Sequence, residues 1–316
     1  MTTPSRSDAN DRESLEHRIH RHVVMLADSI GERNLWRPGT LAVAAGYIRH
    51  ELRRMGYEVK SQSFVVDSVE VENLEAELGG HGPDQDIVII GAHYDSVVGC
   101  PGANDNATGV AALIEVARML AGSRPALTLR FVAFVNEEPP FFQTGDMGSW
   151  QYSRRCKTNG ENIVGMLSLE TIGYYSSEKG SQNYPFPFSL FYPSTADFIG
   201  FVGNLSSRTL IRRVKSAFES HSDFPCESAS VPGWLTGIGW SDHWSFWQHG
   251  YPALMVTDTA LFRYHAYHTM EDTSEKIDYE NLARVVEGLT WVAADLARIA
   301  DFDLRAGLTE EHLDDH

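Results

Sequence analysis

The segment IIGAHYDSVVGCPGANDNATGVAALIE, residues 89–115, constrains the fold more than any other stretch of the sequence. It begins within an apolar run, 86–94, that lacks the alternation of a half-exposed strand and is therefore typical of a strand covered on both faces. A loop with His93, Asp95 and Asp105 follows, and the residues from 108 onwards predict a helix. A buried strand that ends in clustered imidazole and carboxylate groups needs a compensating positive charge.

The same order of strand and helix recurs along the chain. Because buried strands that alternate with helices favour a largely parallel sheet with helices on both faces, the sequence predicts an α/β fold, a three-layer α/β/α sandwich with a largely parallel mixed central sheet. Sheets of this kind place their functional sites at the carboxyl ends of the strands. The predicted strands are 58–66, 69–78, 86–94, 127–138, 163–175, 198–204 and 252–258, and the predicted helices are 13–28, 41–56, 108–122, 148–156, 207–220, 241–250 and 279–300.

The 316 residues suffice for one large domain, which we place at 13–303. Residues 1–12 are polar and are expected to form a disordered N-terminal tail, and residues 304–316 a polar C-terminal tail. Between about 174 and 240 Pro, Ser and Gly are frequent, which predicts a loose insertion within the domain.

Charge and apolar patterning exclude several classes of partner. A formal net charge of -17 argues against nucleic acid and against an anionic membrane surface, since both favour basic patches. No run approaches the roughly 18 apolar residues that span a bilayer. Three cysteines and no visible signal peptide favour a cytoplasmic protein, although an exported chain after removal of its signal would look the same. The sequence gives no indication of oligomeric state.

Side chains that commonly bind metals end strands or begin loops at five places. Each has an ordinary structural explanation when taken alone, but Glu170 lies in MLSLETIG with apolar neighbours on both sides, and a buried carboxylate needs a partner or a metal. Nitrogen and oxygen ligands suit a hydrolytic zinc site, and two ions sharing a bridging carboxylate would offset the acidic cluster. The five places are His93, Asp105, the pair Glu137–Glu138, Glu170 and His268.

Seven motifs in order carry a resemblance to a known family. The chain resembles the zinc peptidases of family M28, whose members include leucyl-type aminopeptidases and whose relatives include glutamate carboxypeptidase II and glutaminyl cyclase. The resemblance covers residues from Asp86 to the closing helix and implies a zinc-exopeptidase-like fold. The motifs are GAHYDSV, GANDNATGVAALIE, FVAFVNEE, GSWQYSRR, LSLETIG, SDHWSF and YHTMEDTSEKID.

The resemblance implies two Zn²⁺ per chain and a role for each polar residue. Carried over by position, the first metal has the ligands His93 and Glu170, the second has Glu138 and His268, and Asp105 bridges them. Glu137 becomes the general base and Asp95 the acid behind the first histidine. The Asp105–Asn106 peptide bond is expected to be cis, as it often is in the family.

One residue departs from the family pattern. Glu170 stands where the family usually has Asp, and because Glu is one methylene longer, the first metal is expected to be shifted or held more weakly. Three further residues have weaker signals. Asp242 in SDHWSF is either a residue that orients a ligand or a helix N-cap, and Tyr267 or Tyr264 would donate to a developing oxyanion or pack in the core.

The leading functional hypothesis is a dinuclear zinc aminopeptidase acting on a peptide or a small amide. Two alternatives remain open: a glutaminyl-cyclase-like acyltransferase with a single zinc, and an inactive binding module on the same scaffold. Substrate side-chain preference, and the choice between amino- and carboxy-specificity, are not determined by the sequence.

Overall fold

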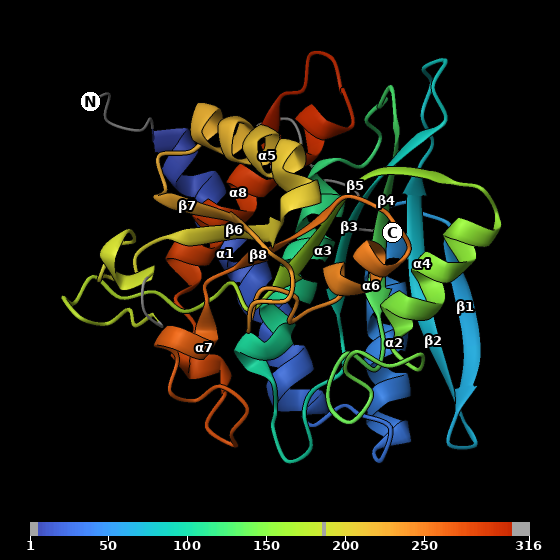
Figure 1. Ribbon diagram of the computed structural model, residues 1–316, viewed down its shortest axis with the longest axis horizontal. Helices are drawn as coiled ribbons and strands as arrows, with labels where there is room; N and C mark the ends of the chain where they lie inside the picture. The colour runs from blue at the N-terminus through green and yellow to red at the C-terminus, as the bar shows by residue number, and fades with distance from the viewer. Residues whose placement is uncertain (1–5, 185–187, 305–316) are drawn as a thin grey trace.

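A mixed eight-stranded sheet forms the centre of the protein in the computed structural model, which describes residues 6–184 and 188–304 (Figure 1). The strand order is β1-β2-β4-β3-β5-β8-β6-β7. The strands are β1 Val59–Val66, β2 Val69–Leu78, β3 Asp86–His93, β4 Thr128–Phe134, β5 Asn162–Glu170, β6 Ile199–Asn204, β7 Cys226–Val231 and β8 Ala253–Thr257.

The four central strands β4, β3, β5 and β8 run parallel to one another. β1 and β2 extend one edge in antiparallel fashion, and β6 pairs antiparallel with β8 and parallel with β7 at the other edge. The central strands are buried along almost their whole length, as their unbroken apolar runs predict. The α/β class and the mixed sheet are therefore confirmed.

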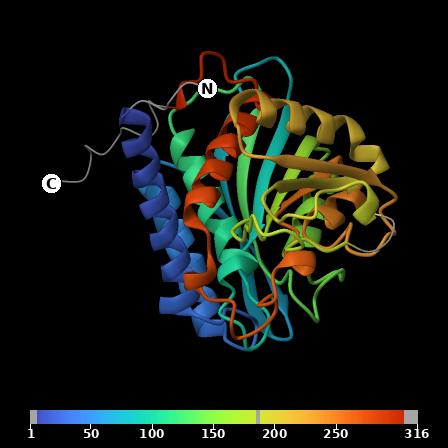
Figure 2. The same ribbon diagram turned by 90° about the vertical axis from the view of Figure 1, so that its left-hand side faces the viewer.

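Helices cover both faces of the sheet. α1, α2, α3, α5 and α8 pack over one face around the larger apolar core, while α4 and α6 cover part of the other face around Phe134 and Phe246. Figure 2 shows α1 and α8 side by side on the first face. The helices are α1 Arg6–Val23, α2 Pro38–Arg54, α3 Thr108–Met119, α4 Gly148–Thr158, α5 Arg208–His221, α6 His243–Gln248, α7 Ala260–Arg263 and α8 Tyr279–Leu296, with short turns η1 Val24–Ile30, η2 Ala103–Ala107, η3 Phe188–Leu190, η4 Leu205–Ser207 and η5 Ser274–Lys276.

Two segments differ from the sequence-based expectation. α1 begins at Arg6, so residues 6–12, expected to be disordered, are helical; no Pro or Gly interrupts the chain there, and an established helix extends readily. Residues 1–5 lie outside the described part. Within the segment 174–240, expected to be loose, the strand predicted at 198–204 is β6 and the helix predicted at 207–220 is α5; β7, which completes the sheet edge, was missed because CESASV has no apolar alternation. Most of the predicted C-terminal tail, residues 305–316, also lies outside the described part.

No helix in the described residues is long and apolar enough to cross a membrane.

Candidate metal centre

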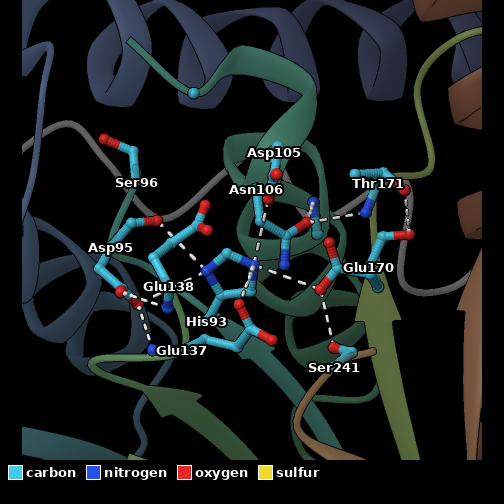
Figure 3. A network of polar contacts seen from close by, with 12 residues as sticks. His93, Asp95, Ser96, Asp105, Asn106, Glu137, Glu138, Glu170, Thr171 and Ser241 are labelled. Atoms are coloured by element: carbon cyan, nitrogen blue, oxygen red, sulfur yellow. Dashed lines mark hydrogen bonds and ion pairs between the residues drawn. The ribbon is translucent and has the colours of Figure 1, made fainter. Parts of the chain in front are cut away.

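Neighbouring parallel strands bring polar side chains to one edge of the sheet (Figure 3). His93 is the last residue of β3 and Glu170 the last residue of β5. Glu137 and Glu138 follow β4 after the short stretch 135–136. Because carboxyl ends of parallel strands meet at the same edge, the topology alone gathers four of the expected residues.

The first group of potential ligand atoms comprises His93, Asp105 and Glu170. His93 Nε2 lies 3.2 Å from Asp105 Oδ1 and 3.2 Å from Glu170 Oε2. Asp105 reaches the centre from η2, the turn between β3 and α3, and its peptide bond to Asn106 is cis, as the resemblance implies.

The second group comprises Asp105, Glu138 and His268. His268 follows α7 and adopts a left-handed backbone conformation with φ of 57°. Its Nε2 lies 3.0 Å from Asp105 Oδ2 and 3.4 Å from Glu138 Oε2. Asp105 thus belongs to both groups, and its two oxygens face different imidazoles. A third possible group, His93 with Glu137 and Glu138, overlaps these two.

The cluster is electrostatically unbalanced, and its members other than the exposed His268 are buried. Burial and neighbouring carboxylates raise the pKa values of Glu137 and Glu138 well above the usual value of a glutamate. Burial likewise raises the pKa of Glu170. Burial alone would lower the pKa of His93, but Glu170, Asp105 and Asp95 raise it well above its usual value. Carboxylates at such close range need a compensating cation to stay ionised together.

Within the described part of the chain, three buried atoms of this cluster have no hydrogen-bond partner: His93 Nε2, Asp105 Oδ1 and Glu138 Oε1. Buried polar atoms are usually hydrogen-bonded, so unpaired ones that converge on one point need an explanation. Imidazole nitrogen and carboxylate oxygen are ligands that divalent zinc accepts. The donor set therefore fits a pair of divalent cations.

Asp95 makes contacts beyond the expected one. Its Oδ1 lies 3.5 Å from His93 Nδ1, while that nitrogen lies closer, at 3.2 Å, to the Asp95 backbone carbonyl. The carboxylate also accepts hydrogen bonds from the amides of Glu137 and Glu138, at 3.2 and 3.1 Å. The chain turns just before this pair, at Asn136, whose φ is 59°. Asp95 therefore links the β3 loop to the β4 loop as well as facing the imidazole.

Sequence reasoning missed a buried arginine that organises the loop after β3. The Arg33 side chain is fully buried, and it donates hydrogen bonds only to backbone carbonyls in the described structure. Burial lowers its pKa to about 10, against the favourable charges of Asp95 and Asp272. The accepting carbonyls are those of Leu26, Gly31, Tyr94, Pro101 and Gly102, so Arg33 fixes the path of the loop from His93 towards Asp105.

Two other positioning groups were also missed, although both lie in motifs already noted. Asp272 accepts hydrogen bonds from the amides of Asn104 and Asp105, at 2.8 and 3.0 Å, and so holds the backbone of η2. Ser241 donates a 2.7 Å hydrogen bond to Glu170 Oε2. In SDHWSF the expected contributor was Asp242, but its neighbour Ser241 makes the contact.

Asp242 and Tyr267 lie near the centre with different surroundings. Asp242 occupies the N-cap position of α6 without a side-chain capping bond and is fully buried. Neither of its carboxylate oxygens has a hydrogen-bond partner in the described structure, and burial raises its pKa to about 7. The Tyr267 ring stacks on the His268 ring with centroids 3.9 Å apart. The alternative tyrosine, Tyr264, donates its hydroxyl to Asp272 at 2.8 Å. Tyr267 is therefore the better placed of the two to meet a substrate.

The buried His243 in α6 predicts a loss of stability in acid. Burial lowers its pKa to about 4, against the weaker opposing effect of its hydrogen bond to the Ile238 carbonyl, whereas an unfolded histidine titrates near 6.5. Because the folded-state pKa is the lower one, the contribution of neutral His243 to the free energy of unfolding is fully present above about pH 6.5. It decreases by about 3 kcal/mol as the pH falls towards 4.

Urea unfolding at pH 7.5 and pH 4.5 tests this prediction. The wild type is expected to lose about 2–3 kcal/mol more between these pH values than His243→Gln. Titration of other groups is common to both proteins and cancels in the comparison. His50→Gln, at an exposed position, should behave as the wild type does. An equal decrease in the free energy of unfolding between pH 7.5 and pH 4.5 in the wild type and in His243→Gln would contradict the prediction.

Comparison with known proteins places the chain in a family. The sequence profile of peptidase family M28 matches residues 73–292. The chain is 38% identical to the uncharacterized protein YfbL of Escherichia coli over 88% of this chain and 87% of the relative. It is 31% identical to a probable zinc metalloprotease of Pyricularia oryzae, over 46% of this chain and only 29% of that longer protein.

Solved structures show the same fold. The structure superposes on BSAP, a zinc aminopeptidase from Bacillus subtilis, with a TM-score of 0.70 and 17% identity, covering 89% of this chain and 94% of that one. It superposes on glutaminyl cyclase from Fimbriiglobus ruber with a TM-score of 0.64 and 18% identity, covering 88% and 94%. Since the profile match spans well over half of the sequence, this chain belongs to peptidase family M28.

Proposed function

We propose that this protein is a dinuclear zinc aminopeptidase that removes the N-terminal residue of a peptide or small amide. Family membership and the name of the B. subtilis neighbour, a zinc aminopeptidase, support the activity and the metal. The proposed ligands are His93, Asp105 and Glu170 for one zinc and Asp105, Glu138 and His268 for the other.

The observation that carries the proposal is the position of Asp105. One of its oxygens lies 3.2 Å from His93 and the other 3.0 Å from His268. Ligand atoms about 2.0 Å from a tetrahedral zinc lie roughly 3.3 Å from one another. The imidazole–carboxylate distances of both groups, 3.0 to 3.4 Å, suit ligands of one ion each, with Asp105 shared.

Zinc bound here supplies Lewis acidity, which polarises the scissile carbonyl and lowers the pKa of a water molecule at the centre. Glu137 is the proposed general base. Glu137 Oε2 lies 3.9 Å from His93 Nε2, whereas the proposed ligand oxygens of Asp105 and Glu170 lie 3.2 Å from that nitrogen. The Glu137 carboxylate is therefore near the proposed ligands without being one of them. Burial and the charges of Glu170 and Asp242 raise its pKa, so it accepts a proton more strongly and returns it to the leaving amine.

The charge balance favours a substrate amine over a substrate carboxylate. Two divalent cations carry four positive charges, whereas six carboxyl groups lie in or beside the centre; with Asp242, whose pKa is about 7, protonated, the remaining five still exceed four. The remaining negative charge attracts the α-ammonium of an N-terminal residue and repels a C-terminal carboxylate. The carboxyl groups are Asp95, Asp105, Glu137, Glu138, Glu170 and Asp242.

The single-zinc cyclase remains the second candidate, because a glutaminyl cyclase shares the fold. The presence of two complete ligand groups favours the dinuclear hydrolase, since a one-metal enzyme has no need of the second group. The same two groups, together with Glu137, argue against an inactive binding module.

Metal analysis combined with a substrate panel tests the proposal. We expect two zinc ions per chain and cleavage of aminoacyl coumarin amides that a chelator abolishes and added zinc restores. The matched N-acetylated amides should resist cleavage, because they lack the α-ammonium. One zinc per chain with cyclisation of N-terminal glutamine would support the cyclase instead, and cleavage that resists the chelator would contradict a metal mechanism.

A further inference from the structure

A pocket of about 930 Å³, including its open mouth, adjoins the candidate metal centre and shares Glu170 and Tyr267 with it. The α7 region, Tyr184, and residues from 188–198 and 236–240 line it over the β8–β6–β7 edge of the sheet. Aromatic side chains contribute part of the wall: Tyr184, Phe188, Tyr192, Phe198, Trp240 and Phe262, beside Tyr267.

The sheet register places one carboxylate at each end of this pocket. Glu170 of β5 pairs with Thr257 of β8, Thr257 with Gly200 of β6, and Gly200 with Glu227 of β7. Residues paired directly across a sheet point to the same face. Three steps of roughly 4.8 Å between strands put the Cα atoms of Glu170 and Glu227 about 14 Å apart. All four residues line the pocket, and Gly200 leaves the row open between Thr257 and Glu227.

Glu227 has no partner that would account for its charge. None of the described residues gives its side chain a hydrogen bond or an ion pair, and the described lining of the pocket contains no Lys, Arg or His. Burial raises its pKa despite the nearby Lys215, whose ammonium bonds to Glu219 and to the Cys226 carbonyl instead. The buried hydroxyl of Tyr184, also in the pocket lining, has no hydrogen-bond partner among the residues that the structure describes.

We propose that this pocket receives the side chain of the substrate's N-terminal residue and that Glu227 selects a long cationic side chain, that of lysine or arginine. This inference rests on the proposed aminopeptidase activity. An extended lysine side chain spans roughly 6 Å from Cα to ammonium. With about 3 Å for a contact at each end, it bridges most of the distance from the metal centre to Glu227. The aromatic wall suits the apolar stem and the cation alike.

Rates on matched substrates test the inference on the zinc-loaded protein. Lysyl, arginyl, norleucyl and phenylalanyl coumarin amides compare a charged side chain with an uncharged one of similar length and with an aromatic one. We expect a higher kcat/KM for the cationic substrates. Glu227→Gln should lower the lysyl-to-norleucyl ratio of kcat/KM at least about 10-fold, because the cation loses its charged, partly buried partner in the pocket.

A matched variant controls for the loss of one negative charge. Glu178→Gln removes the same charge from an exposed position in the 174–198 segment, outside the pocket lining, and should leave the lysyl-to-norleucyl ratio unchanged. Because the ratio is measured within one protein preparation, partial misfolding of a variant does not imitate the expected result. Glu227→Asp, which keeps the carboxylate, should retain part of the preference for lysine.

Binding measurements separate this inference from the proposed function. Cleavage that favours norleucyl or phenylalanyl substrates, or a ratio unaffected by Glu227→Gln, would overturn the pocket assignment and leave the aminopeptidase intact. If no substrate is cleaved, the proposed function fails, and calorimetry with free L-lysine and L-norleucine decides the pocket. If lysine binds more tightly than norleucine and Glu227→Gln removes the difference, the pocket assignment is supported. Equal affinities for lysine and norleucine in the wild type overturn it.

Discussion

Replacing Glu137 with glutamine is expected to lower kcat by about 10²- to 10⁴-fold while both zinc ions remain bound. The substitution preserves the size of the side chain and removes only its ability to accept a proton. Glu137 lies outside the two groups that share Asp105, so zinc affinity should not depend on it. Zinc content by mass spectrometry and turnover on the preferred aminoacyl amide provide the two measurements.

The adjacent residue provides the contrast for this experiment. Glu138→Gln weakens a proposed ligand of the second zinc, so it is expected to lose metal as well as turnover, whereas Glu137→Gln loses turnover alone. Near-normal turnover of Glu137→Gln would remove this residue from the role of base. Loss of zinc in Glu137→Gln would instead favour the third possible ligand group, which contains Glu137.

The substitution Asp105→Asn is expected to lower the zinc content from two ions per chain to fewer than one. Asp105 faces both imidazoles, so removing its charge weakens both proposed sites at once. Turnover should fall at least about 10²-fold, because the chemistry depends on both ions. The stabilisation that zinc gives against thermal unfolding should also diminish, because a metal that binds only the folded state stabilises it in proportion to its affinity.

The control for this variant is an exposed aspartate. Asp146→Asn, in the turn before α4, should retain both ions and full turnover. If Asp105→Asn loses one ion and keeps the other tightly bound, Asp105 does not bridge, and the two groups act as independent sites. That outcome would require a different account of how Glu137 meets the attacking water.

Sequence alone predicts much of the fold, because the central strands are unbroken apolar runs. His93, Glu170 and the pair Glu137–Glu138 fall where such strands end, and parallel strands end at a common edge, so their proximity follows from topology. Asp105 and His268 reach the centre from loops. Both were among the five places singled out from the residues, but their specific roles came from the family resemblance.

Other features depend on contacts between distant segments and leave no local signal. Arg33 looks like an ordinary charge in a turn, yet it is fully buried among carbonyls from two other parts of the chain. β7 is a partly exposed edge strand whose residues have no alternating pattern. Glu227 therefore gives no indication in the sequence that it pairs in register with Gly200 and lines a pocket.

The Arg33 and Asp272 contacts have a consequence for how the protein is made. The loop to Asp105 is fixed from one side by a guanidinium near the N-terminus and from the other by a carboxylate some 240 positions later, as the residue numbers show. A nascent chain on the ribosome has neither Asp272 nor His268 until most of its synthesis is complete. The proposed pair of zinc sites would therefore become complete only late in synthesis, once both His268 and Asp272 have been made.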